Sequence, residues 1–363
     1  MSRIENLDKN FKVGKPETKN NLLWLPATDR RLTIRGLAWL RENKGHLYRL
    51  PLRAEKIVRP PVWSLGQCPA SAHIGFRTDS TRISVRAALS NNNNFMANMP
   101  ATGSHGLSLY CGGPGQWRYW ATAVPDLNQF SYERSLFECD RKMREFRIYL
   151  PLYSGLPKLK IGFDIKAKIL PPSPPRMPKP IVFYGTSITQ GGCANTSGSD
   201  FVSSIGRQLN LNVINLGFAG NGKGEPELAE LISKINASLY VLDYAANVDV
   251  VKLKHTLPPF TRILRKHHPK TPILLLSQIC YARYDYDSVT RARLDGGRDV
   301  VITFYSQRRR AGDQNIHFAD GFGLLPFGTD GAHVDGAHPT SHGFQIMAER
   351  LAPQIAQILL RNA

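Results

Sequence analysis

The 363-residue sequence is poor in cysteine, and it has no long hydrophobic run. Its five cysteines are scattered and lack the paired spacing of zinc or haem sites, so we expect reduced thiols, a cytoplasmic protein, and neither a metal nor a cofactor. No apolar stretch approaches the roughly 20 residues of a membrane-spanning helix. The first ten residues are polar and charged and lack the apolar core of a signal peptide. We therefore expect no contact with a membrane.

Acidic residues are also scarce, and the deficit is concentrated in one half of the chain. Residues 1–179 hold 29 Lys and Arg residues against 13 Asp and Glu residues, whereas residues 180–363 hold 18 against 15. A basic half can attract an acidic carrier protein or another polyanion, or it can simply be a solvated surface. The sequence contains no zinc finger and no aromatic signature of a base-stacking sheet, so nucleic acid is not an expected partner.

Two patterns of secondary structure follow one another along the chain. Between residues 21 and 170, short β-type runs broken by Gly, Pro and Asn predict an all-β, jelly-roll-like sandwich. The expected strands are Leu47–Leu50, Ile83–Arg86, Leu107–Tyr110, Trp117–Trp120, Arg147–Leu150 and Leu159–Gly162. Residues 1–20 are polar and are predicted to be flexible. The proline-rich residues 171–179 predict an extended linker.

From residue 180 to residue 363, apolar strand-like runs alternate with helical patterns. The alternation predicts a three-layer α/β/α domain with a flavodoxin-like parallel sheet. The expected strands are Ile181–Tyr184, Val213–Leu216, Leu239–Asp243, Pro272–Leu276 and Ile316–Phe318. The expected helices lie near residues 199–209, 225–235, 250–267, 296–311 and 341–361.

Polar residues and glycines follow the strands of this predicted sheet. Because the carboxyl ends of parallel strands meet in one crevice, a Ser187 nucleophile could lie beside a His338 base that Asp335 orients. The backbone N–H groups of Ser187 and Gly220 and the side-chain amide of Asn247 could stabilise an oxyanion. Asn247 could instead only cap the following helix, and Ser187 could be an ordinary residue of a Gly-rich turn.

The sequence Asp-Gly-Ala-His occurs twice, ending at His333 and at His338. Pro339 and a helical pattern follow the second copy, which predicts that His338 is held rigidly beside the crevice. His333 lies in a Gly-rich loop where its ring would be less well fixed, although it could still contact a substrate. Tyr281 and Arg283 follow the fourth strand and either line the substrate pocket or form a surface loop.

These blocks resemble those of the SGNH (GDSL-type) hydrolase superfamily, in which Ser, Gly, Asn and His occur in this order and Asp precedes His by three residues. The matching residues are Ser187, Gly220, Asn247, Asp335 and His338. The sequence is also similar to members whose N-terminal jelly roll ends in a GxDLY-type segment, which residues 106–110 resemble. Three positions depart from the family pattern, namely Thr186, Ser108 and Ala246.

The resemblance implies a serine esterase acting on acyl, often acetyl, esters of a carbohydrate or another small molecule. It also leaves open an acyltransferase of a natural-product pathway, which would use an acyl carrier or a CoA donor. A carbohydrate-binding protein with an inert hydrolase domain is a third interpretation, and the complete set of five residues argues against it. A phosphate-binding loop is not expected near residues 217–224, because Gly224 stands where that motif requires Ser or Thr.

Overall fold

The computed structural model describes Asp8 and residues 22–90, 96–126 and 129–361. The predicted flexible segment, residues 1–20, lies outside the described residues except for Asp8. Among the helices of the described part, none combines the length and the apolar character needed to cross a membrane.

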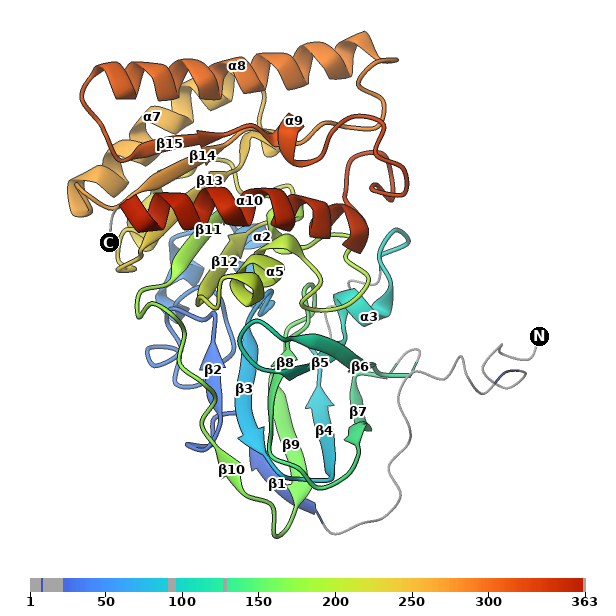
Figure 1. Ribbon diagram of the computed structural model, residues 1–363. Coiled ribbons are helices and arrows are strands. Elements are labelled where there is room, and N and C mark those ends of the chain that lie inside the picture. The colour runs from blue at the N-terminus through green and yellow to red at the C-terminus, as the bar shows by residue number, and fades with distance from the viewer. Residues whose placement is uncertain (1–7, 9–21, 91–95, 127–128, 362–363) are drawn as a thin grey trace.

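Residues 22–170 contain a sandwich of two antiparallel sheets, which confirms the predicted β-sandwich (Figure 1). One sheet has the order β1 (Leu22–Pro26), β9 (Lys158–Asp164), β4 (Arg82–Ala88) and β7 (Ser131–Glu138). The other has the order β10 (Ile169–Leu170), β3 (His73–Thr78), β8 (Arg144–Tyr149), β5 (Leu107–Gly112) and β6 (Arg118–Ala123), with β2 (Thr33–Arg35) also paired to β3. Leaving aside the short β2 and β10, consecutive strands alternate between the sheets as they do in a jelly roll, except that β5 and β6 form a hairpin within one sheet.

Alternating residues of the two sheets form the core of the sandwich. Ile83 and Val85 on β4 face Phe146 and Ile148 on β8, and all four side chains are fully buried. The period of two along each strand explains why the sequence pattern located most of these strands.

The predicted strand at Leu47–Leu50 is wrong. These residues form no strand, and they precede the short helices η2 (Leu52–Lys56) and α2 (Pro60–Gly66). Leu50, Ala54 and Val62 are buried in the core beneath the parallel sheet rather than in the sandwich. A short apolar run does not by itself distinguish a strand from a loop that is buried by long-range packing.

The remainder of the chain contains a five-stranded parallel sheet, as predicted. Its order is β12 (Val213–Gly217), β11 (Ile181–Gly185), β13 (Leu239–Asp243), β14 (Ile273–Leu276) and β15 (Ile316–Ala319). Numbered along the chain this order is 2-1-3-4-5, which is flavodoxin-like, so the direction of winding changes between β11 and β13. Ligands of such sheets bind at this switch point, outside the carboxyl ends of the strands.

Helices cover both faces of the parallel sheet, which explains why its strands are almost continuously apolar. The helices α5 (Phe201–Gln208) and α10 (Ser341–Arg361) pack on one face (Figure 1). The helices α6 (Pro226–Ile232), α7 (Val250–His267) and α8 (Ser288–Arg310) pack on the other face.

Helix α8 begins eight residues earlier than the sequence pattern predicted. Asp287 caps it by accepting hydrogen bonds from the backbone N–H groups of Val289 and Thr290. The glycine pair Gly296-Gly297 lies inside the helix, where a Cβ on Gly297 would come within 3.1 Å of the Gln278 side chain. These glycines allow the helix to pack closely against the Gln278 segment, so they lie within the helix and do not mark its beginning.

A buried arginine joins the N-terminal part of the chain to the parallel sheet. The Arg49 guanidinium is fully buried and donates hydrogen bonds to four backbone carbonyls, those of Leu65, Cys68, Asn215 and Gly217. Burial lowers the pKa of Arg49 to about 10, which leaves it charged at neutral pH. Two of its acceptors lie on β12, directly before the loop that carries Gly220.

We expect Arg49→Met to lower the free energy of unfolding by about 3 kcal/mol, because it leaves buried carbonyls without donors. The matched control is Arg53→Met, which removes an exposed ion pair with Glu42 and should cost less than about 1 kcal/mol. Urea unfolding of both variants measures the difference. Equal unfolding midpoints for the two variants would contradict the structural role of Arg49.

Candidate active site

Ser187 begins a one-turn helix at the carboxyl end of β11, a feature that the sequence pattern did not predict. The helix α4 (Ser187–Gln190) has a capping box, in which the Thr186 hydroxyl accepts from the Ile188 N–H and the Thr189 hydroxyl accepts from the Thr186 N–H. Thr186 therefore caps the helix at a position where the family pattern has Asp. As the first helical residue, Ser187 has a backbone N–H with no acceptor inside the helix.

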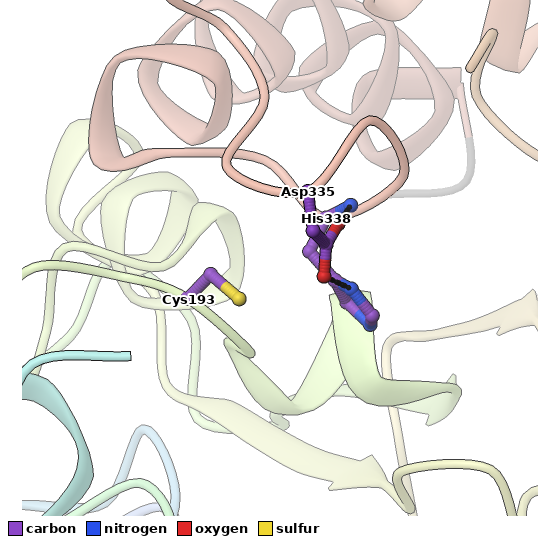
Figure 2. Close-up of side chains that lie close together, drawn as sticks. All are labelled: Cys193, Asp335 and His338. Carbon is purple, nitrogen blue, oxygen red and sulfur yellow. Dashed lines mark hydrogen bonds and ion pairs between the residues drawn. The ribbon is translucent and has the colours of Figure 1, made fainter. Parts of the chain in front are cut away.

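Three side chains form a continuous hydrogen-bonded relay at this edge of the sheet. The Ser187 Oγ lies 2.8 Å from His338 Nε2, and His338 Nδ1 lies 2.8 Å from Asp335 Oδ2. Asp335 and His338 lie on the same loop before α10, and Figure 2 shows their side chains in contact there. A carboxylate accepts the Nδ1–H, which leaves Nε2 free to accept the proton of the serine hydroxyl.

Further hydrogen bonds hold the Asp335 carboxylate in its charged form. Burial opposes that form, but bonds from the His338 backbone and ring, the Asn98 side chain and the Ala337 backbone outweigh it and lower the pKa of Asp335 well below its usual value. Asn98 donates to Asp335 Oδ2 at 2.9 Å from the loop before α3 (Ala101–Ser104). No local feature of the sequence marks Asn98 as a site residue, since only the packing of two distant segments brings it to this site.

The predicted oxyanion donors lie around the same opening. Gly220 has a φ of +64°, and no atom lies within 4 Å of the position that a Cβ would occupy, so its backbone faces open space. The Asn247 Nδ2 donates to the carbonyls of Phe218 and Gly222 at 3.2 and 3.1 Å, which ties down the loop that carries Gly220. Asn247 does not cap the next helix, because Asp249 caps α7. Its role as an oxyanion donor stays a prediction.

We expect Asn247→Ala to lower kcat by roughly 10²–10³ with little effect on KM, as for the loss of one oxyanion donor. The control is Asn221→Ala, since Asn221 also donates within this loop, to the Ala219 carbonyl at 2.8 Å, but does not line the opening. Steady-state kinetics with an aryl ester measures both variants. A folded Asn247→Ala variant with full activity would leave Asn247 only its role in holding the loop.

The relay opens into a cavity of about 530 Å³. Ser187, Gly220, Asn247 and His338 line it, and so do Tyr281 and Arg283 from the loop after β14, which favours a pocket over a plain surface loop for that segment. The other lining residues are Met96, Asn98, Tyr153, Ile188, Gly192, Cys193, Ala219, Ala246, Arg293 and Ala337. Asn98, Tyr153 and Arg293 are among those that the sequence analysis did not select.

His333 is not among the lining residues of this cavity. Its Nε2 lies 3.1 Å from the Cys280 carbonyl oxygen, and its backbone forms an isolated bridge with Pro339. Burial lowers the pKa of His333, which favours the neutral ring. The expectation of a poorly fixed ring in this loop is therefore wrong, because the loop is pinned to the chain just before α10.

A buried carboxyl group supports the turn beneath the relay. Asp243 ends β13, and its Oδ2 accepts a hydrogen bond of 2.7 Å from the Thr189 hydroxyl of α4. Burial raises the pKa of Asp243 to about 7. This contact joins the helix that begins at Ser187 to the neighbouring strand.

Cys193, Asp335 and His338 are close enough together to hold a metal ion. Their ligand atoms lie within 4.8 Å of one another, and the Cys193 thiol points toward the other two side chains (Figure 2). However, burial and the nearby Asp335 charge raise the pKa of Cys193 to about 12, so the thiol is neutral. The imidazole is also engaged at both nitrogens, and this arrangement suits proton transfer better than metal binding.

Two protein-family models match the chain. Residues 178–356 match the GDSL-like Lipase/Acylhydrolase family, and residues 22–169 match the N-terminus of SGNH-hydrolase-type esterases, the GxDLY domain. The chain belongs to the SGNH (GDSL-type) hydrolases with a GxDLY-type N-terminal domain and is an SGNH-type serine hydrolase. This membership confirms the resemblance seen in the sequence.

Solved structures share the whole architecture. A GDSL-like lipase from Bacteroides ovatus is 28% identical, with a TM-score of 0.86 over 93% of this chain and 98% of that one. The salicylyl-acyltransferase SsfX3 of a tetracycline biosynthetic pathway is 21% identical, with a TM-score of 0.76 over 93% and 97%. The acetyl xylan esterase Est2A from Butyrivibrio proteoclasticus is 12% identical, with a TM-score of 0.58 over 93% and 99%. The search of curated proteins gives no match.

Proposed function

We propose that the protein is a serine esterase that hydrolyses acetyl or other short-chain acyl esters of a carbohydrate or natural product. The observation that carries the proposal is the relay from Ser187 through His338 to Asp335 at the floor of an open cavity. The hydroxyl, the base and the group that orients the base have the separations that nucleophilic catalysis requires.

The first half of the reaction forms an acyl-enzyme. His338 Nε2 takes the proton of Ser187 as Oγ attacks the ester carbonyl, and Asp335 stabilises the imidazolium. The N–H groups of Ser187 and Gly220 would hold the tetrahedral oxyanion, and the Asn247 amide would join them by turning one of its two hydrogens away from the Phe218 or Gly222 carbonyl. His338 then donates its proton to the departing alcohol.

The second half of the reaction releases the acid. A water molecule enters the cavity, His338 removes its proton, and the resulting tetrahedral intermediate collapses with release of Ser187. The chain's own residues supply each proton transfer, so this scheme routes no step through a metal or a cofactor.

The test is a product profile on acetylated xylosides, acetylated glucosides and aryl acetates, with acetate and free alcohol quantified. Stoichiometric release of both products, at a rate that depends on Ser187, is the expected result. Absence of turnover on every ester class would contradict the proposed esterase function.

Acyl transfer is the second candidate function, and the apolar lining residues Met96, Ile188 and Ala219 favour it because they suit an organic acceptor alcohol. An acyltransferase would pass the acyl group from Ser187 to an alcohol, and its donor would be a CoA ester or an acyl group on an acidic carrier protein. One structural neighbour is described as a salicylyl-acyltransferase. The product profile repeated with acceptor alcohols distinguishes hydrolysis from acyl transfer, since transfer yields a new ester in place of free acid.

A further inference from the structure

Two arginines line the cavity that holds Ser187, and no carboxylate lines it within the described residues. Arg283 lies in the loop after β14, and Arg293 lies in the first half of α8. The remaining lining residues are apolar or uncharged, with His338 as the base. The cavity therefore has an excess of positive charge that the catalytic relay does not use.

The acidic residues next to these arginines in the sequence form their hydrogen bonds and ion pairs with other groups, although the Arg283 charge contributes to the lowered pKa of Asp287. Asp285 pairs with Arg291, and Asp287 accepts from Thr290 and from the backbone at the start of α8. Asp295 accepts a hydrogen bond of 2.8 Å from the Tyr284 hydroxyl. Among the described residues, neither Arg283 nor Arg293 forms a salt bridge with a carboxylate.

Arg293 is also held in place toward the cavity. Its guanidinium carbon lies 5.5 Å from the centre of the Tyr281 ring, and Tyr281 is buried and itself lines the cavity. A cation stacked on an aromatic ring loses little side-chain freedom when it binds a ligand. A guanidinium presents a planar fork of donors that matches the two oxygens of a carboxylate.

We propose that Arg283 and Arg293 bind an anionic group of the substrate, so that the preferred esters carry a carboxylate or a similar oxyanion away from the scissile bond. This inference rests on the proposed esterase function, since it places the anion relative to an ester carbonyl at Ser187. The charged group could lie on the acyl side or on the alcohol side of the ester.

The experiment uses two matched pairs of esters that differ by one charge. For the acyl side the pair is 4-nitrophenyl hydrogen adipate and its methyl ester, and for the alcohol side it is 4-acetoxybenzoate and its methyl ester. We expect kcat/KM to favour the charged member of at least one pair by about tenfold or more, and the pair that shows the preference locates the anion. We expect Arg283→Gln and Arg293→Gln to lower this charged-to-neutral ratio about tenfold each.

Arg262→Gln is the control, because Arg262 is an exposed arginine on α7 that does not line the cavity. The charged-to-neutral ratio of kcat/KM for this variant should equal that of the wild type. Equal rates for both members of both pairs, or an unchanged ratio in both cavity variants, would overturn the inference while leaving the esterase intact.

Binding measured by calorimetry separates this inference from catalysis. The Ser187→Ala variant should bind the intact charged ester more tightly than its methyl ester, and adding Arg293→Gln should remove the preference. This preference without any turnover by the wild type would support the anion site and contradict the esterase. No preference in binding would contradict the anion site.

Discussion

Ser187→Ala is expected to lower kcat by about 10⁴-fold or more on any ester that the wild type hydrolyses. The reason is that Ser187 carries the acyl group, and removal of the nucleophile leaves only the residual effects of binding and the oxyanion hole. A fluorophosphonate probe should label Ser187 in the wild type, with the modified peptide identified by mass spectrometry. The variant should show no labelling.

Ser199→Ala is the control for this experiment. The Ser199 hydroxyl lies in the loop before α5, where it donates to the Thr196 carbonyl, and the residue does not line the cavity. Labelling and activity should therefore match the wild type. If Ser187→Ala were labelled at another serine and kept full activity, the nucleophile would be assigned to the wrong residue.

His338→Ala is expected to lose about 10³-fold or more of kcat, whereas His333→Ala should stay within about tenfold of the wild type. His338 Nε2 lies 2.8 Å from the Ser187 hydroxyl, and a general base must lie within hydrogen-bond reach of the proton that it removes. His333 instead contacts the Cys280 carbonyl and lies outside the cavity lining. Steady-state kinetics and circular dichroism on both variants provide the measurement.

The two histidines serve as controls for each other because each ends a copy of Asp-Gly-Ala-His in the same loop. We expect His333→Ala to lower the melting temperature, since its ring contact is structural, while kcat stays within about tenfold of the wild type. An inactive His333→Ala together with an active His338→Ala would shift the base by five residues.

The elements that were predicted correctly are those whose pattern is set by residues close together in the sequence. The alternation of Ile83 and Val85 with polar neighbours identified β4, and continuous apolar runs identified the strands of the parallel sheet. Local turn chemistry was less informative. The one-turn helix at Ser187 depends on a capping box of two threonines, which a search for apolar periodicity cannot detect.

The predictions that failed concern segments whose environment is set by distant parts of the chain. Leu50 is buried in the core cluster that includes side chains of α6 and α7 rather than in a strand, and Gly296 and Gly297 inside α8 lie against Val250 and Gln278. The His333 loop is ordered by Cys280 and Pro339. Each of these contacts joins residues whose proximity has no signature in local periodicity.

The sequence by itself determined the order of the two folds, the strand ends that carry the polar residues, and the five residues proposed for catalysis. Period-two and period-3.6 patterns and the fixed direction of parallel strands are sufficient for the folds and the strand ends, because they are properties of short segments. The choice of the five residues also rested on their resemblance to the SGNH pattern. Only the tertiary structure decided that Asn98 reaches Asp335, that His333 lies outside the cavity lining, and that Arg293 lines the cavity together with Arg283. These positions depend on how separate loops pack, which is a balance of many long-range contacts that no local pattern records.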